Sequence, residues 1–343
     1  MRIIIDAMGG DNAPQAPIRG AVMARKEYDC SITLVGQEDV IRKVLEEDGI
    51  DQLPPGIDIV NATEVVEICD NPSTAWREKK DSSLTVGLKM LKDNKGDAFI
   101  SAGSTGALLS AGTLIVKRIP GIRRAAVAPI VPTGAGSAVL IDAGANSDCT
   151  AEYLCQFALM GSFYAQRALG RKNAKVGLLN IGAEPSKGTE FYKQVHEMLA
   201  DMGERGKINF VGNTEPNAVA SEDAPDVIVA DGFTGNILLK AMEGTAAFLL
   251  KNIKKVFTAN MKTKLGYLMV KDNLGDLKKL ADSRETGGTA FLGLRKAVFK
   301  AHGSSDAYAI CRAVGKAVEF VDAHIIEAIT EQVESIQPVK NAE

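Results

Sequence analysis

Short apolar runs alternate with helix-length stretches along most of the chain. The runs are apolar at successive positions, which is typical of parallel strands covered by helices on both faces. The predicted strands cover residues 3–5, 32–35, 57–60, 98–100, 127–131, 138–141, 176–179, 208–211, 227–230 and 297–300. The short Pro- and Gly-containing link between 127–131 and 138–141 suits an antiparallel hairpin. We therefore predict an α/β fold with a mixed, largely parallel sheet and helices on both faces.

One long helical region changes the character of the chain. Residues 236–260 have helical periodicity, and apolar side chains continue it at Met261, Leu265, Leu268 and Met269. Between residues 251 and 280, eight lysines and two acidic residues give a local charge of +6. Gly266 and the Asn-Leu-Gly at 273–275 predict a break, so we expect a projecting helical hairpin at about 251–283. Lysines beside an apolar helix face are typical of a helix lying on an anionic membrane, and packing against a second subunit is the alternative.

Composition and charge exclude several classes of protein. The 343 residues are 45% apolar and 24% charged, as in ordinary globular proteins, and the formal net charge is −3, so no global basic field points to nucleic acid. Five cysteines show no CxxC pair and no Cys/His metal spacing, which fits a reducing cytoplasm. No apolar run is long enough to span a membrane. We expect one α/β catalytic unit over residues 1–343, ending in a helix predicted over 306–335.

Glycine-rich polar loops follow six of the predicted strands. They lie at residues 6–12, 101–106, 142–146, 180–184, 231–236 and 302–305. In a parallel sheet such loops share the carboxyl edge, where exposed N–H groups and helix N-termini bind anions, especially phosphate. Each loop alone is better explained as a helix cap or turn. Six of them on one edge predict an anion-binding site.

The absence of three common motifs, together with a histidine and two lysines, limits the reactions that this site could catalyse. The chain has no phosphate loop of the ATPase type, no Gly-x-Gly-x-x-Gly in its first strand–helix turn and no Gly-x-Ser-x-Gly elbow. His302 is the histidine that sits in a loop at a strand end, where it either functions in the site or caps its own loop. Lys80 and Lys187 lie beside turns of small residues, and each is either a counter-charge for an anion or a solvated surface group.

Seven segments together resemble the bacterial phosphate acyltransferases of the PlsX type. They are residues 4–11, 79–83, 101–108, 142–146, 180–182, 230–236 and 301–305. The resemblance implies transfer of a fatty acyl group from acyl carrier protein to inorganic phosphate, giving acyl phosphate for phospholipid synthesis without a cofactor or metal. It also implies a homodimer, with a fold similar to that of isocitrate and isopropylmalate dehydrogenases and phosphotransacetylases. We expect peripheral association with the inner face of the cell membrane, where a downstream membrane acyltransferase is a further candidate partner.

The implied reaction assigns roles to the loops. Phosphate is itself the nucleophile, so direct attack on the thioester needs positioning and oxyanion stabilisation rather than a catalytic Ser or Cys. The candidate catalytic residues are Asn180, Asn236, His302 and Lys187. The candidate residues for binding phosphate or the acyl group are Asp6, Gly9, Gly10, Lys80, Ser104, Thr105, Gly106, Asp231, Thr234, Gly235, Ser304 and Ser305. Because acyl carrier protein is acidic, we expect it to dock on a basic patch near the mouth of the site. The candidate residues are Lys117, Arg118, Arg123 and Arg124, and a solvated loop is the alternative for them.

Two other functions remain open at this level. A metal-dependent decarboxylating dehydrogenase of the same fold needs clustered carboxylates, which Asp6, Asp11, Asp142 and Asp231 imitate, but it also needs an arginine group that the sequence lacks. A non-catalytic scaffold for lipid enzymes at the membrane surface is the second alternative. Phosphate-dependent loss of an acyl thioester distinguishes the acyltransferase from both.

Overall fold

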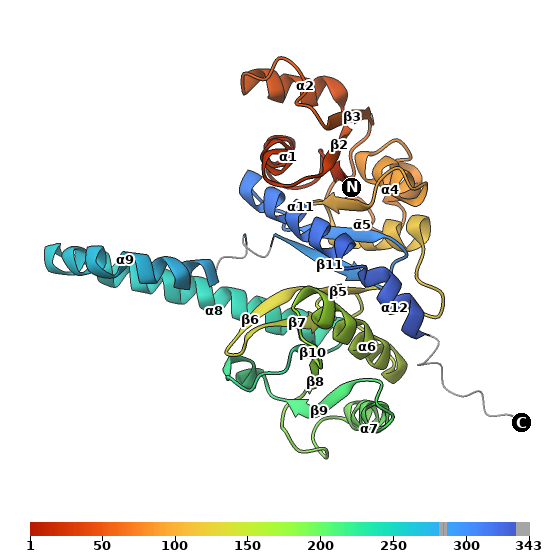
Figure 1. Ribbon diagram of the computed structural model, residues 1–343, viewed down its shortest axis with the longest axis vertical. Coiled ribbons are helices and arrows are strands. Elements are labelled where there is room, and N and C mark those ends of the chain that lie inside the picture. Colours follow the sequence, from red (N-terminus) through yellow and green to blue (C-terminus); the bar gives the residue numbers. More distant parts are fainter. Residues whose placement is uncertain (281–283, 285–286, 334–343) are drawn as a thin grey trace, which may run out of the picture.

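Two β-sheets form the frame of the molecule (Figure 1). The computed structural model describes residues 1–280, 284 and 287–333. The first sheet contains, in spatial order, β3 (Ile57–Asn61), β2 (Ser31–Gly36), β1 (Arg2–Asp6), β4 (Ala98–Ser101), β12 (Ala297–Ala301), β11 (Gly288–Leu292) and β5 (Ala126–Ala128). The second contains β6 (Ile130–Thr133), β7 (Gly136–Ile141), β10 (Val227–Val229), β8 (Lys175–Leu179) and β9 (Asn209–Thr214). Most neighbours are parallel, and the pairs β12–β11, β11–β5 and β6–β7 are antiparallel.

The mixed, largely parallel α/β fold is confirmed, but the expectation of one sheet is wrong. The apolar run predicted as a single strand over 127–131 is divided at Pro129 between β5 in the first sheet and β6 in the second. Proline has no N–H to donate to a strand ladder, so the chain leaves one sheet and enters the other at this residue. The predicted hairpin is present, with Ile130 opposite Val139 in the β6–β7 pair.

Helices cover both sheets and create three hydrophobic clusters. The largest cluster spans both sheets and includes α1 (Gln15–Glu27), α6 (Ala151–Ala168) and α11 (Ala307–Asp322). A second lies under α4 (Ser83–Lys92), α5 (Thr105–Ala111) and the π-helix η1 (Gly112–Val116), and a third packs the start of α8 (Gly232–Thr258) on the second sheet. The remaining elements lie around this frame: α2 (Glu38–Glu47), α3 (Ala75–Glu78), α7 (Glu190–Glu204), the 3₁₀ helix η2 (Pro216–Ala220) and α12 (Ile325–Val333). Because the largest core is shared, it holds the two sheets together.

Helices α8 and α9 (Met261–Leu280) project away from both sheets as a hairpin (Figure 1). The expected break at Gly266 or 273–275 is wrong, because α9 is helical through both positions. The turn lies instead at 259–260, where the Asn260 side chain accepts the N–H of Thr263 and caps α9. Helix α8 itself begins at residue 232, and its first turns pack on the second sheet before the expected range of the hairpin. Residues 281–283 of that range lie outside the described residues.

Two further expectations need correction. The predicted final helix over 306–335 is two helices, α11 and α12, separated at His324, whose φ of 50° is incompatible with a continuous helix. Residues 334–335 lie outside the described part of the chain. Strand β11 was not predicted, since its Gly-Thr-Ala-Phe-Leu sequence carries little of the β-branched pattern. Among the helices that the structure describes, none is both long and apolar enough to cross a membrane.

Candidate functional site

The six glycine-rich loops fall into two groups, because their strands belong to two sheets. The loops after β1, β4 and β12 lie at the carboxyl edge of the first sheet, where these strands are parallel neighbours. Those after β7, β10 and β8 lie at the carboxyl edge of the second sheet. The groups are linked at Asp142, whose carboxylate accepts the N–H of Val127 in β5 at 2.9 Å. The second group therefore lies against the first sheet, and Lys240 at the start of α8 is close enough to act on the charge of Lys300 in β12.

Gly9 and Gly10 allow the three loops of the first group to approach closely. A Cβ at Gly9 would lie 2.5 Å from Asp6 Oδ2 and 2.9 Å from the Gly103 nitrogen. Gly10 has a φ of 109°, and a Cβ there would lie 2.8 Å from Ala102 Cβ. Only glycine fits both positions without a shift of the neighbouring backbone. These glycines thus bring the loop after β1 against the loop after β4.

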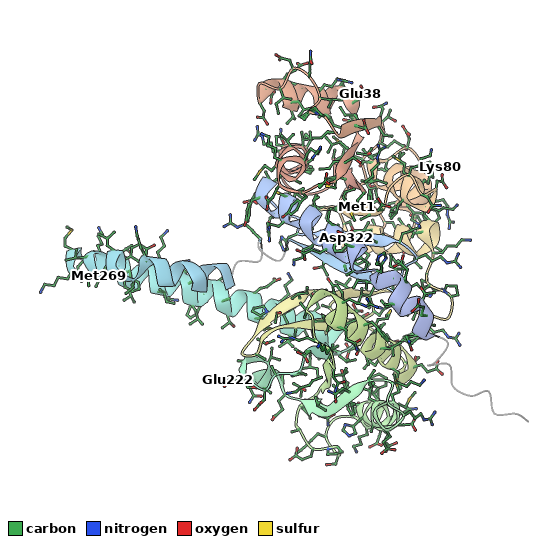
Figure 2. All side chains as sticks on the ribbon, viewed as in Figure 1. Met1, Glu38, Lys80, Glu222, Met269 and Asp322 are labelled. Atoms are coloured by element: carbon green, nitrogen blue, oxygen red, sulfur yellow. The ribbon has the colours of Figure 1, made fainter. Side chains whose placement is uncertain are left out.

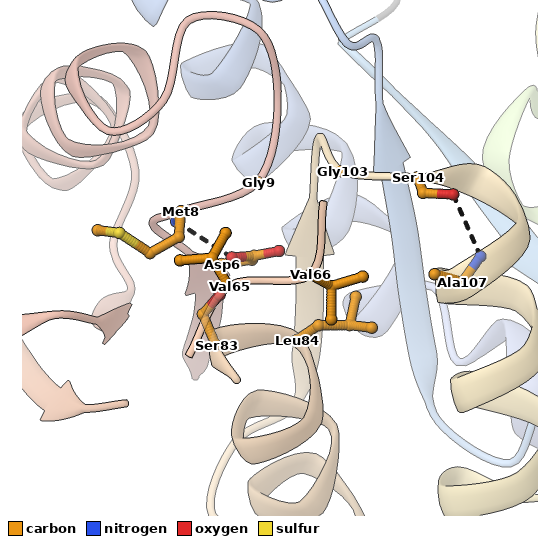
Figure 3. A pocket seen from close by; sticks show the side chains of 10 residues that line it. All are labelled: Asp6, Met8, Gly9, Val65, Val66, Ser83, Leu84, Gly103, Ser104 and Ala107. Carbon is orange, nitrogen blue, oxygen red and sulfur yellow. Dashed lines mark hydrogen bonds between the residues drawn. The ribbon is translucent and has the colours of Figure 1, made fainter. Parts of the chain in front are cut away.

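Asp6 organises the floor of the first group (Figure 3). Its carboxylate accepts the hydroxyl of Ser101 at 2.7 Å and the N–H of Met8 at 3.1 Å. Burial raises the pKa of Asp6, and the hydrogen bonds from Ser83, Ser101 and Met8 oppose that rise. Its oxygens are engaged with the protein, so Asp6 shapes the loops from below.

A small pocket opens above Asp6, and Figure 3 shows its lining side chains. They are Asp6, Met8, Gly9, Val65, Val66, Ser83, Leu84, Gly103, Ser104 and Ala107. Ser104 caps α5 by accepting the N–H of Ala107, whereas Thr105 and Gly106, in the first turn, are exposed. The first N–H groups of a helix have no partner within it, so those of Thr105 and Gly106 are available to an anion.

The loop after β12 contributes His302, Ser304 and Ser305. His302 Nδ1 lies 2.9 Å from the Ser304 hydroxyl, so the ring is held within its own loop. The side-chain amide of Asn12 donates to the carbonyls of Ser304 and Ser305 and ties this loop to the loop after β1. Ser305 Oγ is buried and has no partner among the described residues. It is the unused hydroxyl of this group.

Asp231 shapes the second group by capping α8. It accepts the N–H groups of Phe233 and Thr234, the Thr234 hydroxyl at 2.8 Å and the phenol of Tyr192. The helix therefore begins at Gly232, four residues before the predicted start. Thr234 and its N–H are committed to this cap, and Gly235 packs against the carbonyl of Asp142. Tyr192, which the sequence interpretation missed, fixes Asp231 from α7.

Asn180 and Asn236 occupy different environments. The Asn180 amide is buried and bridges its own loop, donating to the Lys187 carbonyl at 3.2 Å and accepting the N–H of Ile181. The Asn236 side chain is exposed, beside Gly144 in the loop after β7, and has no hydrogen-bond partner among the described residues. Asn236 is therefore free to face a substrate, while Asn180 holds the loop that carries the exposed Lys187.

The predicted cations are distributed unevenly. Lys80 is exposed just before α4, and its neighbour Lys79 is paired with Asp70 at 2.5 Å. A lysine that the sequence interpretation missed, Lys300, ends β12 and donates to the Ala102 carbonyl at 3.1 Å. The available signal was a single charge at the end of the buried run Ala-Val-Phe-Lys-Ala. Lys300 brings a positive charge among the first group of loops.

The basic stretch 117–124 begins far from the first group of loops and ends close to the second. Helix α5 and η1 carry the chain from the carboxyl edge of the first sheet to its opposite edge, where the N–H of Ile119 donates to the Gly293 carbonyl beside the β11–β12 turn. The whole length of β12 separates this turn from His302. The end of the basic stretch lies beside the second group, because the Asn146 amide donates to the Ala125 carbonyl at 2.8 Å, so docking of the carrier at these residues stays a prediction.

A cysteine and an aspartate beside the second group of loops have raised pKa values. Cys149 lies beside the second group, where burial and the Asp142 carboxylate raise the pKa of its thiol to about 12, so it carries no thiolate at neutral pH. Burial also raises the pKa of Asp142, whose carboxylate accepts the N–H groups of Ala145 and Asn146.

Within residues 1–280, 284 and 287–333, no three His, Cys, Asp or Glu side chains come together as a metal site.

Comparison with known proteins assigns the chain to a family. The family model described as fatty acid synthesis protein matches residues 1–328. A phosphate acyltransferase from Alkaliphilus oremlandii (strain OhILAs) is 45% identical over 336 residues, covering 98% of each chain. One from Clostridioides difficile (strain 630) is 42% identical over 332 residues, 96% of each chain.

Solved structures agree on the fold. A phosphotransacetylase from Streptococcus pyogenes matches with a TM-score of 0.61 and 19% identity over 95% of this chain and 94% of that one. A 4-hydroxythreonine-4-phosphate dehydrogenase from Klebsiella pneumoniae matches with a TM-score of 0.53 and 12% identity over 94% and 98%. These two structures confirm the fold, which occurs in both a phosphotransacetylase and a dehydrogenase. The relatives at 42% and 45% identity are phosphate acyltransferases, and they identify the family. The chain therefore belongs to the phosphate acyltransferases, the enzymes of this fatty acid synthesis protein family.

Proposed function

We propose that the enzyme transfers a fatty acyl group from acyl carrier protein to inorganic phosphate and releases acyl phosphate. A phosphate oxygen attacks the thioester carbonyl, the carbonyl oxygen becomes an oxyanion, and the C–S bond then breaks to release the carrier thiolate, which takes up a proton. The protein must hold phosphate beside the carbonyl and stabilise the oxyanion. No acyl-enzyme is formed.

The main support is the set of uncommitted donors in the loops of both sheets. The first-turn N–H groups of Thr105 and Gly106 and the Asn236 amide face outward without protein partners among the described residues. Cys149, the cysteine beside these loops, is held as a thiol. The described part of the site thus offers hydrogen-bond donors but no activated cysteine beside them. This suits a reaction in which phosphate, the second substrate, is itself the nucleophile. In this proposal Asn236 faces the oxyanion and Lys187 supplies counter-charge, while His302 orients phosphate or protonates the leaving thiolate.

The test is product formation with purified protein, palmitoyl-acyl carrier protein and radiolabelled phosphate in the presence of a chelator. We expect labelled palmitoyl phosphate in proportion to the carrier thiol released. Omission of phosphate, or its replacement by sulfate, is the control. Thioester loss that is independent of phosphate contradicts the proposal.

We also propose that the α8–α9 hairpin delivers the product at an anionic membrane surface. Its exposed apolar side chains include Phe248, Val256, Met261, Leu265, Leu268 and Met269, and Figure 2 shows Met269 on the projecting part. Between residues 251 and 280 its described lysines are Lys251, Lys254, Lys255, Lys262, Lys264 and Lys271. The side chains of Lys278 and Lys279 lie outside the described residues. A cationic helix with an exposed apolar face suits a lipid interface. Contact with a second subunit in a homodimer is the competing use of the same face.

A further inference from the structure

Lys300 connects two loops of the site through its ammonium group. Its side chain is mostly buried at the end of β12. The ammonium donates to the carbonyl of Ala102, in the loop after β4, and to the carbonyl of Ala301, at the start of the loop after β12. An ammonium has three N–H donors, and the described residues accept from two of them. One donor is therefore left for a further acceptor.

The charge of Lys300 has no direct counter-ion in the described part of the chain. No described carboxylate forms an ion pair with it, although mostly buried lysines are nearly always paired. Burial lowers the pKa of Lys300 to about 8, and the carboxylates of Asp11 and Asp6 oppose that change from a greater distance. Binding of an anion at the third donor would supply the missing counter-charge.

The surroundings of Lys300 favour a small, strongly charged anion. Lys240 on α8 acts on Lys300 from the other sheet's elements, but its charge is balanced by an ion pair with Glu243 at 2.7 Å. The residues opposite Lys300 on the neighbouring strands, Ser101 on β4 and Thr289 on β11, are uncharged. The partnerless Ser305 hydroxyl belongs to the loop that follows Lys300. Among the described residues, Lys300 therefore brings an unpaired positive charge to a region whose following loop holds an unused hydroxyl.

We propose that the Lys300 ammonium binds the phosphate substrate in the loops at the end of β12. This inference rests on the proposed function for the identity of the anion. The charge holds one phosphate oxygen and leaves another free to attack, and Lys300 takes no covalent part. The competing explanation is purely structural, with Lys300 serving only to connect the two carbonyls.

The decisive measurement is binding of inorganic phosphate by calorimetry, without any acyl donor. We expect Lys300→Met to weaken phosphate binding at least 10-fold at pH 7. Lys296→Met, just before the opposite end of β12, is the matched control and keeps the wild-type affinity. Melting without phosphate separates the explanations: removal of an uncompensated charge leaves the melting temperature equal or higher, whereas loss of a purely structural link lowers it. Affinity within twofold of wild type in Lys300→Met overturns the proposal.

Lys300→Arg provides a second test that does not depend on the stability of the methionine variant. Arginine stays charged at every accessible pH. In the wild type, phosphate affinity should fall as the pH rises through about 8, because the lysine loses its proton. The fall should be absent from Lys300→Arg, and phosphate's own titration is common to both proteins. An identical fall in both proteins overturns the proposal.

A turnover assay separates this inference from the proposed function. If the wild type binds phosphate through Lys300 but forms no acyl phosphate from acyl carrier protein, the phosphate site stands and the acyl donor is wrong. If acyl phosphate forms while both lysine variants bind phosphate normally, the reaction stands and the Lys300 assignment fails.

Discussion

At the residue scale, the exposed amide of Asn236 gives a direct test of oxyanion stabilisation. Asn236→Ala should lower kcat/KM by a factor of about 10² to 10³, or about 3–4 kcal/mol in the barrier, which is typical for loss of one such donor. The melting temperature should hardly change, since the amide has no protein partner among the described residues. Asn252→Ala, farther along α8, is the control, because that amide donates only to the Phe248 carbonyl. Wild-type kinetics in Asn236→Ala remove the residue from the site.

A second prediction at this scale concerns the nucleophile. Cys149→Ala should retain turnover within about threefold of wild type, because a thiol with a pKa of about 12 is a poor nucleophile at neutral pH. Mass spectrometry of the wild type, quenched during a single turnover, should show no mass increase of one acyl group. An acyl adduct on Cys149 that forms and decays at the rate of turnover would replace direct attack with a two-step mechanism.

At the element scale, the hairpin predicts separable membrane binding. Leu265 and Leu268 are 64% and 62% exposed on α9, so Leu265→Glu with Leu268→Glu should abolish sedimentation with anionic vesicles by removing apolar contact and adding repulsion. Turnover of soluble acyl carrier substrate should remain near wild type. Ile68→Glu, at a loop residue that is 74% exposed, is the control for added charge. If the double variant instead lowers the mass of the assembly measured by light scattering, the hairpin is a subunit interface.

At the scale of the whole molecule, Lys300 links stability to pH. Its pKa is about 8 in the folded protein, against 10.5 for the free side chain, so between these values the unfolded chain binds more protons. The Lys300 contribution to the free energy of unfolding therefore rises with pH across that window, by on the order of 3 kcal/mol at most. Urea unfolding without phosphate should show Lys300→Met more stable than wild type at pH 7, with the difference shrinking by pH 10. A difference that is independent of pH contradicts this linkage.

The sequence by itself determined the elements and the loops. Local patterns are enough for this, because a run such as Ile3–Ile5 is apolar on both faces and so must lie between covering helices. The glycine-rich turns after the strands likewise follow from backbone freedom, which is a property of the residue. The family resemblance of the seven segments rested on the same local stretches, and the full-length comparison confirmed it.

Only the tertiary structure decided which loops lie together and which of their polar groups are already hydrogen-bonded within the protein. It assigned β5 and β6 to different sheets at Pro129 and separated the six loops into two groups. It also showed that the Asp231 carboxylate accepts the first N–H groups of α8, while the Asn236 amide has no partner among the described residues. Whether a side chain already has a hydrogen-bond partner depends on residues that are distant in sequence. Tyr192 is such a partner for Asp231, and Ala102 is one for Lys300. Burial and electrostatic pairing arise only when the chain is folded, and for this reason the charge at Lys300 could not be recognised from its own segment.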